Sequence, residues 1–498
     1  MSEIRKCKIS GKEFKISDDD IKFYNQINVP LPTLCPEERQ RRRLIWRNER
    51  HLYQRNCDLC KKNIISIYSK DCEFPIYCES CFWSEKWDPL NYGIDFDFAA
   101  NFFEQLEDLF RVVPKLAITH ANSVNSDYTL NSIENKNCYL TSGADYNENC
   151  HYGISSQRSK DCIDTFLIYD SESSYGSLDS SKIFNCIGCQ NCENVSNSWF
   201  LYDCINCKDC AFSSNLRNTQ YVLFNKKLDK EEYKKELSKK LKEYFENPDW
   251  LHEGRMKVKD KAIKHKLIVN SDQVTGDYVR NCRNSSNIFD AENLENCKFA
   301  FYATAIKDSY DISCVSFNCK NLYEVMSACN GHDVFFSNAS LYSHDAEYCV
   351  TCFDSAYIFG SISLKSDQYV ILNKQYSKED YEIMKQKIIR HMKETKEYGE
   401  FFPSSLSPFQ YNRSSAIDYM PLTKEEANIL GYLWQDNPNI YENMMSNVSI
   451  KCETCNIFFN LVDYEMNFYK KKNIPFPKFC WACRLRKIID CRAAKEIS

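Results

Sequence analysis

The chain has 498 residues, of which 43% are hydrophobic and 14% aromatic, so it can form three or four domains with sizeable cores. Its formal net charge of −5 excludes a general attraction to nucleic acid, so any such binding would need a local basic patch. It has 28 cysteines, no apolar run in "MSEIRKCKIS" and no apolar stretch of membrane-spanning length. This combination predicts a cytoplasmic protein whose thiols bind metal or stay reduced. The alternative is an oxidised exterior protein that leaves the cell by another export route.

The first region, expected over residues 1–50, contains a metal-site pattern with half of its ligands replaced. Ser10 stands where a second cysteine would follow Cys7, and Glu38 stands where one would follow Cys35. Serine is a poor zinc ligand, and two thiolates with one carboxylate make an unusual structural site. Two alternatives remain open: a metal-free module held by its aromatic residues, or a site completed by Glu38 or a distant residue.

A basic helix is predicted in "PEERQRRRLIWRNERHLYQRNC". On a helix, Arg39, Arg43, Arg47 and Arg50 would lie within roughly 80° of one another, with Trp46 at the edge of that face. Such a face suits phosphates and an unstacked base, which predicts contact with nucleic acid. In the alternative, the arginines pair with acidic groups of the chain: Glu37, Glu38, Glu49 or the stretch "DFDF".

A zinc ribbon and a connecting helix are expected over residues 51–118. Cys57 and Cys60 form one CxxC pair, Cys78 and Cys81 form another, and positions 61–77 separate them. This spacing is typical of a four-cysteine zinc site. The segments "IISIY" and "FPIY" read as strands of a small hairpin, and Cys72 is left over as a core thiol.

The middle of the chain repeats the dipeptides Asn-Cys and Asp-Cys. Between residues 119 and 398, eleven of sixteen cysteines follow Asn or Asp, and Cys138, Cys150 and Cys162 are spaced by 12. Such periodicity predicts a solenoid, here a parallel β-helix. Asn and Asp tolerate left-handed corners, and the following cysteine would point inward to form a stacked ladder of thiols.

Two questions about this region remain open. The number of residues in one coil could be 12, the spacing of Cys138 and Cys150, or twice that number, the spacing of Cys162 and Cys186. A ladder that binds soft metal is a further hypothesis, which apolar burial of the thiols disfavours.

The solenoid is predicted to be duplicated, with halves at 119–248 and 249–398. The segments "QYVLFNKKLDKEEY" (220–233) and "QYVILNKQYSKEDY" (368–381) share eight of fourteen residues at an offset of 148. Each leads into a helix with a capping residue, Asp229 or Ser377. We expect these helices to pack on the solenoid or close its end; the alternative is a basic helix that binds a partner.

Residues 399–448 are expected to be a linker with a short helix in "TKEEANILGYLW", followed by a zinc module at 449–498. There, Cys452 and Cys455 form one CxxC pair, and Cys480 and Cys483 form another. Two such turns can direct four thiolates at one tetrahedral zinc ion.

The stretch "CETCNIFFNLVDYEMNFYKKKNIPFPKFCWACRLRK" resembles the probable zinc-ribbon family of treble-clef type. The shared pattern is CxxC, an aromatic hairpin, an acidic residue, Phe-Tyr, a basic turn, Pro and a CxxCR with trailing basic residues. The resemblance implies that Cys452, Cys455, Cys480 and Cys483 are zinc ligands. It also implies an accessory module associated with nucleic acid or a ribonucleoprotein.

The N-terminal stretch aligns with this module without a gap at an offset of 445. Cys7 falls on Cys452 and Cys35 on Cys480, so residues 7–43 are predicted to be a degenerate second copy. The chain as a whole resembles uncharacterised cysteine-rich proteins of candidate-phylum bacteria that combine "CPEERxRRR…RNE", "YGxDFDF" and NC-repeats. That resemblance supports the architecture and implies no activity.

No catalytic motif is present, and we do not expect an enzyme. The eight histidines lie outside known catalytic patterns, and only 12 glycines leave little scope for a Gly-rich phosphate loop. A carbohydrate-active β-helix is the exception to consider, with an acidic face formed by Asp161, Asp164, Asp170 and Asp203. Solenoid turns contain Asp for structural reasons as well.

Together these patterns predict an α+β, mainly β protein: a duplicated parallel β-helix-like solenoid flanked by small treble-clef and zinc-ribbon modules. The predicted function is a non-catalytic scaffold with two Zn²⁺ ions that binds nucleic acid or a ribonucleoprotein through the arginine-rich helix, with no role for a membrane. One alternative is a protein-binding assembly scaffold that uses the solenoid face. The second is a carbohydrate-active β-helix protein.

Overall fold

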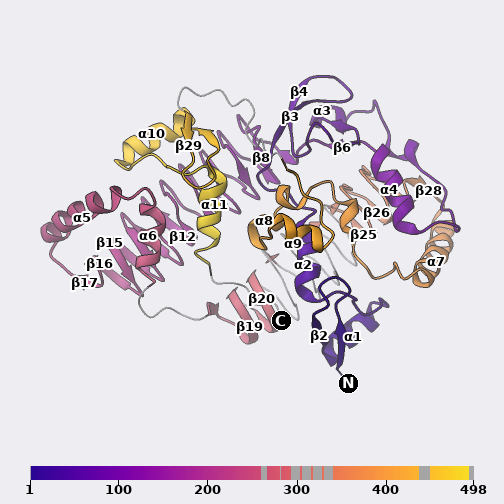
Figure 1. Ribbon diagram of the computed structural model, residues 1–498, viewed down its shortest axis with the longest axis horizontal. Coiled ribbons are helices and arrows are strands. Elements are labelled where there is room, and N and C mark those ends of the chain that lie inside the picture. The colour runs from indigo at the N-terminus through magenta and orange to yellow at the C-terminus, as the bar shows by residue number, and fades with distance from the viewer. Residues whose placement is uncertain are drawn as a thin grey trace. The chain divides into compact units, whose positions relative to one another are not determined.

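The computed structural model describes residues 2–259, 266–280, 282–292, 303–304, 316–317, 323, 328–329, 340–436 and 449–492. The chain forms two compact units. Unit 1 comprises residues 1–117, 266–437 and 495–498, and unit 2 comprises residues 118–265 and 438–494. Each unit therefore combines one half of the solenoid with a small module from the opposite end of the sequence, and Figure 1 shows the elements of both.

The first solenoid half lies in unit 2 and is built from parallel strands. They are β7 (His120–Ala121), β8 (Thr129–Leu130), β9 (Ser132–Ile133), β10 (Thr141–Ser142), β11 (Phe166–Tyr169), β12 (Leu178–Phe184), β13 (Glu193–Ser196), β14 (Trp199–Tyr202), β15 (Ile205–Ser214) and β16 (Arg217–Leu223). Phe166 of β11 pairs with Leu178 of β12, and Ile183 of β12 pairs with Val195 of β13. Paired residues are 12 positions apart, which is the spacing of Cys138 and Cys150. One coil therefore contains 12 residues, the shorter of the two coil lengths left open by the sequence. The predicted parallel β-helix is confirmed.

The coil turns at four left-handed corners. Every third residue from 131 to 224 has a φ between 47° and 66°. Asn137, Asn149 and Asp161 occupy such corners, as their tolerance of left-handed backbone predicts. The corners also include Phe200 and Leu167, which lack that tolerance. Packing and the parallel hydrogen-bond ladder therefore impose the corner even where the residue opposes it.

The residue after each corner points into a narrow interior. From 138 to 213 every one of these residues is buried, and all are Cys, Ser, Thr, Ala, Gly, Asn, Val, Ile or Leu. Cys138, Cys150 and Cys162 follow one another in this way, each at most 2% exposed. Neighbouring coils are joined by bonds such as Cys192 N–H to Ser180 Oγ, 3.1 Å. The predicted thiol ladder is thus present, as part of an interior that accepts only small side chains.

Both solenoid halves end in the same way. In unit 2, β16 pairs antiparallel with β17 (Lys226–Lys227), and α5 (Lys230–Phe245) follows. In unit 1, β27 (Gln368–Ile371) pairs antiparallel with β28 (Lys374–Gln375), and α7 (Lys378–Glu394) follows. Tyr233 of α5 packs on Tyr221, and Tyr381 of α7 packs on Tyr369, both with ring centroids 5.9 Å apart. The predicted duplication is confirmed, and each helix packs on its final coil.

The second solenoid half lies in unit 1, and from the pair Gly276–Ile288 onward its described strands pair at the same interval. Its described strands are β18 (Ile268–Val269), β19 (Asp272–Arg280), β20 (Arg283–Glu292), β21 (Ala303–Thr304), β22 (Ser316–Phe317), β23 (Ala328–Cys329), β24 (Ser340–Leu341), β25 (His344–Glu347) and β26 (Ala356–Phe359). Ser316 pairs with Ala328, and Ala356 pairs with Gln368. The repeat cysteines Cys297, Cys314 and Cys319 lie outside the described residues.

Three small modules complete the units. The N-terminal module (residues 3–44) contains β1 (Glu3–Lys6), β2 (Glu13–Ile16), α1 (Asp18–Gln26) and α2 (Pro36–Leu44). The ribbon module (residues 53–82) contains β3 (Tyr53–Asn56), β4 (Asn63–Ser66), β5 (Ile76–Tyr77) and α3 (Glu79–Phe82). The C-terminal module (residues 449–489) contains β29 (Ser449–Lys451), β30 (Phe458–Asn460), α10 (Asp463–Lys472) and α11 (Trp481–Ile489). Elements of the first and third modules coincide at the offset of 445 to within a residue, as expected for two copies of one module.

The ribbon differs from its prediction in strand pairing. β4, in "IISIY", pairs antiparallel with β3, which precedes Cys57. β5, in "FPIY", pairs in parallel with β6 (Lys115–Leu116), which follows α4 (Phe102–Val112). The two predicted strands therefore do not form a hairpin with each other, because each finds a partner outside the segment between the cysteine pairs.

The segment expected to be a linker is instead part of the core of unit 1. It contains α8 (Ala416–Tyr419) and α9 (Lys424–Ile429), the latter confirming the short helix in "TKEEANILGYLW". Phe401, Phe402 and Tyr411 are at most 1% exposed. The Ser407 hydroxyl donates to the Ile45 carbonyl at 2.8 Å. Residues 399–436 thus cover the end of α2.

In the parts of the chain that the structure describes, no helix has both the length and the apolar character needed to cross a membrane.

Candidate metal centres

Two groups of four cysteines form candidate metal centres. The sulfur atoms of Cys57, Cys60, Cys78 and Cys81 all lie within 4.8 Å of one another, and so do those of Cys452, Cys455, Cys480 and Cys483. Within the described residues no other group of three or more His, Cys, Asp or Glu side chains meets this distance. Both groups fit zinc-ribbon-like modules and could hold a metal ion such as zinc.

Backbone hydrogen bonds hold the cysteines of the ribbon centre in place. Cys57 N–H donates to the Lys62 carbonyl at 2.8 Å, and Lys61 N–H returns to the Cys57 carbonyl at 2.9 Å. Lys61 adopts a φ of 64° to make this turn. Cys78 N–H donates to Cys57 Sγ at 3.3 Å, which joins the two halves of the site. The turn therefore directs both cysteine pairs at one point.

The C-terminal centre repeats this construction. Cys452 N–H donates to the Ile457 carbonyl at 2.9 Å, and Asn456 N–H, at a φ of 61°, returns to the Cys452 carbonyl at 3.0 Å. Cys480 N–H donates to Cys452 Sγ at 3.3 Å. Cys480 is also the N-cap of α11, whose dipole favours a thiolate at that position.

The crowded thiols cannot all ionise together without a cation. Burial raises the pKa of Cys78, but hydrogen bonds from Ser80 and Cys81 outweigh it and bring that pKa to about 7. Burial and the neighbouring Cys60, Cys78 and Cys57 raise the pKa of Cys81 to about 12. The hydrogen bond between Cys480 and Cys483 likewise lowers the pKa of Cys480 to about 5 and raises that of Cys483. A bound divalent ion would relieve this repulsion, so the donor set suits zinc.

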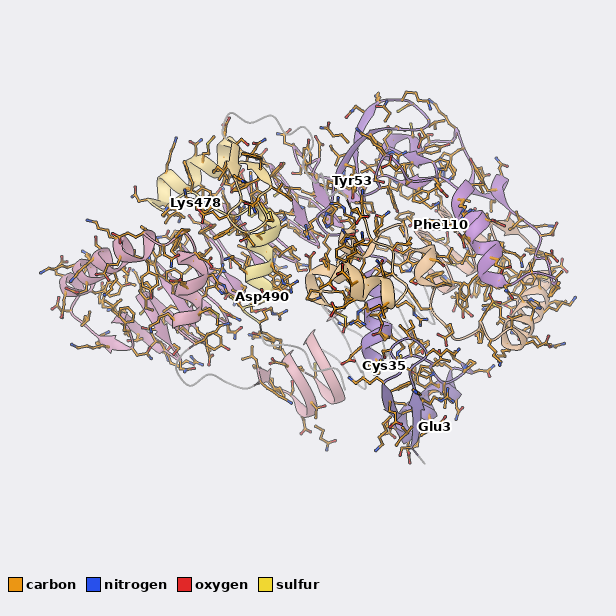
Figure 2. All side chains as sticks on the ribbon, in the orientation of Figure 1. Glu3, Cys35, Tyr53, Phe110, Lys478 and Asp490 are labelled. Atoms are coloured by element: carbon orange, nitrogen blue, oxygen red, sulfur yellow. The ribbon has the colours of Figure 1, made fainter. Side chains whose placement is uncertain are left out.

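The N-terminal module keeps the same turn with two ligands replaced. Cys7 N–H donates to the Lys12 carbonyl at 2.9 Å, and Gly11 N–H, at a φ of 70°, returns to the Cys7 carbonyl at 3.0 Å. Ser10 Oγ lies 3.8 Å from Cys35 Sγ, much as Cys455 Sγ lies 3.7 Å from Cys480 Sγ. Cys35 immediately precedes α2 (Figure 2). The turn therefore forms without a complete ligand set.

Glu38 does not complete the degenerate site. Its side chain is 4% exposed, pairs with Arg41, and accepts a hydrogen bond from the Tyr432 hydroxyl at 3.4 Å. Cys7, Cys35 and Glu38 do not form one of the close groups found among the described residues. Of the two alternatives, these contacts favour a module without zinc.

The predicted arginine face does not form as a single helical surface. α2 ends at Leu44, so Arg47 and Arg50 lie beyond it. Asn48 accounts for the turn, because its Oδ1 accepts from His51 N–H at 2.8 Å and its Nδ2 donates to the His51 carbonyl at 2.7 Å. The expectation of one continuous helix through "PEERQRRRLIWRNERHLYQRNC" is therefore wrong at its second half.

The arginines are also buried rather than presented to solvent. Arg39, Arg43 and Arg47 are 3%, 1% and 8% exposed, and Trp46 is 3% exposed. Arg39 donates to the Leu34 carbonyl at 2.8 Å, Arg47 pairs with Glu49 at 2.6 Å, and Arg50 pairs with Asp418 at 2.9 Å. Trp46 packs on Phe402 with ring centroids 4.9 Å apart. The pairing of Arg47 with Glu49 agrees with the alternative interpretation, in which the arginines pair with acidic groups of the chain. Asp418 and Phe402, the partners of Arg50 and Trp46, come from the segment 399–436.

Each copied module docks on a matching coil of the solenoid, which sequence reasoning missed. In unit 2, Tyr469 of α10 meets Tyr175 edge to face, with ring centroids 5.4 Å apart at 74°. In unit 1, Tyr24 of α1 meets Tyr323 at 5.0 Å and 90°. Tyr24 and Tyr469 are equivalent at the offset of 445, and Tyr175 and Tyr323 at the offset of 148. The two offsets together were the signal that could have revealed this pairing.

A buried charge network adds to the docking in unit 2. Arg484 of α11 pairs with Asp164 of the solenoid at 2.8 Å and with Glu465 of α10 at 3.3 Å. The Tyr152 and Tyr469 hydroxyls donate to Glu465 at 3.0 and 2.7 Å. Burial raises the pKa of Asp164 and of Glu465, and the Arg484 guanidinium, shared between the two carboxylates, only partly offsets it.

The other solenoid aspartates considered for an acidic face are also held in contacts. Asp161 accepts from the Tyr464 hydroxyl at 2.8 Å, Asp170 pairs with Arg158 at 2.7 Å, and Asp203 pairs with Arg217 at 2.8 Å. Together with Asp164 they occupy left-handed corners with a φ of 50–54°. Their positions are explained by the tolerance of Asp for left-handed corners, as the structural interpretation expected.

Among the described residues, the thiols of the ladder do not form a further group of three or more ligand atoms that all lie within 4.8 Å of one another. The pKa shifts along the ladder run in both directions: burial raises the pKa of Cys150 and of Cys186, whereas at Cys189 burial is outweighed by hydrogen bonds with Cys186 and Cys192, which lower its pKa.

No protein-family model matches the chain, and no curated protein matches it significantly.

Proposed function

We propose that the protein is a non-catalytic scaffold in which small modules clamp each half of a β-solenoid, with zinc in the ribbon module and in the C-terminal module. The observation that carries the proposal is the repeated docking contact, Tyr469 on Tyr175 and Tyr24 on Tyr323. A duplicated arrangement that retains the same contact twice is selected for holding a shape.

The chemistry of the described residues supports a structural role. A closed four-thiolate site leaves zinc no open position for substrate or water, and zinc has no redox role there. Many polar side chains of the solenoid occupy corners, as Asn137 does, or form bonds between coils, as Ser180 does. The surface left for a partner is the uncovered side of the solenoid, where Lys136, Glu148 and Lys160 form a charge ladder.

The first test is metal content. Purified full-length protein should contain two zinc ions per chain by elemental analysis. Cys57→Ser and Cys452→Ser should each remove one ion, and Cys72→Ser, outside both groups, should remove none. Equal zinc content in all three variants would reject the two-centre assignment.

A second candidate function, nucleic-acid binding, has support from the C-terminal module rather than from the arginine-rich helix. The last turn of α10 contains Lys470 and Lys471, both exposed, and Lys478 is exposed nearby in the chain. The N-terminal copy has Asn25, Gln26 and Thr33 at these positions. Exposed lysines can contact phosphate without base specificity.

The second test distinguishes binding surfaces. Salt-sensitive binding to a labelled RNA or DNA that weakens in Lys470→Ala/Lys471→Ala would support this candidate. The slope of log affinity against log salt concentration should become less steep by about the contribution of one to two phosphate contacts. Asn25→Ala/Gln26→Ala in the copy is the matched control. Absence of binding at low salt would leave the scaffold without a nucleic-acid role.

A further inference from the structure

The degenerate N-terminal module retains a buried pair of thiols. Cys7 is 2% exposed and Cys35 is 1% exposed. Both side chains belong to one buried cluster with Leu34, and Ser10 Oγ lies 3.8 Å from Cys35 Sγ. The backbone hydrogen bonds of a metal-binding turn, Cys7 N–H to the Lys12 carbonyl and Gly11 N–H to the Cys7 carbonyl, remain although zinc ligands are missing.

Cys7 and Cys35 occupy the positions of Cys452 and Cys480, whose sulfur atoms converge in the C-terminal centre. Phe14 and Leu34 pack against the pair and form a small apolar cluster with it. The site is therefore preformed, dry on one side and limited to two protein sulfurs.

Its donor set excludes zinc and suits a softer ion. Zinc in structural sites takes four nitrogen or sulfur ligands, whereas Ser10 offers a hydroxyl and Glu38 is bound by Arg41 and Tyr432. Soft thiolate ligands bind copper(I) as well as zinc, so the number of ligands decides between the two ions. Structural zinc takes four ligands, whereas copper(I) forms stable linear complexes with two thiolates.

Solvent can reach the pair from one side. Ser10 is exposed, and its Oγ lies 3.8 Å from Cys35 Sγ, so this thiol is one small side chain below the surface. In the C-terminal module the exposed Cys455 occupies the equivalent position. An ion can therefore enter where the missing ligand would have been.

We propose that Cys7 and Cys35 form a two-thiolate site for one copper(I) ion. Binding replaces the two S–H protons, which leave to solvent, by two Cu–S bonds, and no electron is transferred. The site is independent of the scaffold function, which needs only the two four-cysteine centres.

The experiment uses reduced, zinc-loaded full-length protein under anaerobic conditions. Copper(I) is supplied from its bathocuproine disulfonate complex, and copper and zinc per chain are measured after desalting. The expected result is one copper with both zinc ions retained. Cys7→Ser and Cys35→Ser should each lower copper uptake at least about tenfold at the same chelator concentration, whereas Cys72→Ser should not change it.

X-ray absorption on the wild-type protein does not depend on how the variants fold. It should show copper with two sulfur neighbours. Copper uptake that releases zinc, unchanged uptake in Cys7→Ser with folding intact by circular dichroism, or a copper shell of three or four sulfurs would each overturn the proposal.

Discussion

The N-terminal and C-terminal modules have the same fold but are held together by different means. The C-terminal module has four cysteines at its turn and an arginine, Arg484, between two buried carboxylates. The N-terminal module has lost two of those cysteines, and the segment 399–436 covers it, with Tyr432 and Glu400 contacting Glu38 and Arg42. The difference teaches that the turn depends on its backbone hydrogen bonds and that packing can replace the metal.

Substitution of a cysteine that both modules have at the same position should give the largest difference between them. Cys480→Ser should lower zinc from two ions to one and abolish hydrogen-exchange protection over α10 and α11, because structural zinc contributes about 10–16 kcal/mol to small modules. The equivalent Cys35→Ser should keep both zinc ions and cost about 1–3 kcal/mol for burying a hydroxyl. Equal loss of protection in both modules would show that the N-terminal copy also depends on metal.

The converse change should restore the missing centre. Ser10→Cys combined with Glu38→Cys should raise zinc from two ions to three, because the N-terminal turn already has the backbone of a metal site. The double change also breaks the Glu38 contacts with Arg41 and Tyr432, so we expect tighter zinc binding but no gain in stability without metal. Elemental analysis with Ser10→Cys alone as the control checks this, and a count of two in the double variant would contradict it.

The docking tyrosines should matter equally in both units. Tyr24→Ala and Tyr469→Ala should each destabilise their own unit by about 3–5 kcal/mol, as is usual when a buried aromatic side chain is removed. Hydrogen exchange during mild denaturation can assign each loss to its unit. Tyr469→Phe, which keeps the ring and loses the bond to Glu465, should cost about 1 kcal/mol. A large effect in only one unit would mean that the two contacts are not equivalent.

Unit 2 should become less stable as pH rises above the ordinary carboxyl range. Burial raises the pKa of Asp164 and Glu465, so the folded state binds protons more tightly than the unfolded state. The resulting stabilisation is complete below the unfolded pKa, near 4, and is lost as pH rises through the raised values, by at most about 1.4 kcal/mol per pH unit and proton. Protection of α10 measured against pH with zinc in excess should show this slope, and Glu465→Gln should flatten it. A slope unchanged in that variant would assign the effect to other groups.

The smallest expected effect concerns two equivalent ion pairs that differ in exposure. Lys487 pairs with Asp249 at 2.5 Å, and the equivalent Arg42 pairs with Glu400 at 3.0 Å. Lys487→Ala should cost about 0.5–1 kcal/mol and the cost should fall in high salt, because both side chains of that pair are about a quarter exposed. Arg42 is 8% exposed, so Arg42→Ala should depend less on salt. Urea unfolding at low and high salt checks the pair, and the opposite ranking of salt dependence would contradict it.

Much of the fold was predictable because its repeats are visible in the sequence. Asn or Asp before Cys predicted the corner and the inward thiol, as at Cys138 and Cys150. The spacing of the first two CxxC pairs predicted that their four sulfur atoms converge. The coil length was ambiguous because serine also fills interior positions, so cysteines skip a coil between Cys162 and Cys186.

The environment of the arginines was not predictable from local sequence. Arg50 and Arg42 pair with Asp418 and Glu400, which come from a segment near the other end of the chain. A helical pattern reports only the period of the basic residues and carries no information on what covers them. Asn48 stabilises the turn that follows the helix in this basic segment, because its side chain donates to the His51 and Ile67 carbonyls.

The four-cornered coil also limits how the solenoid can change in length. Each side of the coil takes three positions, so an insertion of that size would rotate everything downstream by a quarter turn. Tyr175 would then face a different direction from the one that receives Tyr469. Only whole coils can be gained or lost while docking is kept, unless a bulge absorbs the difference. The second half contains such a place: pairing shifts between Val274 and Gly276, where Asp272 meets Arg283, one position short of a full coil.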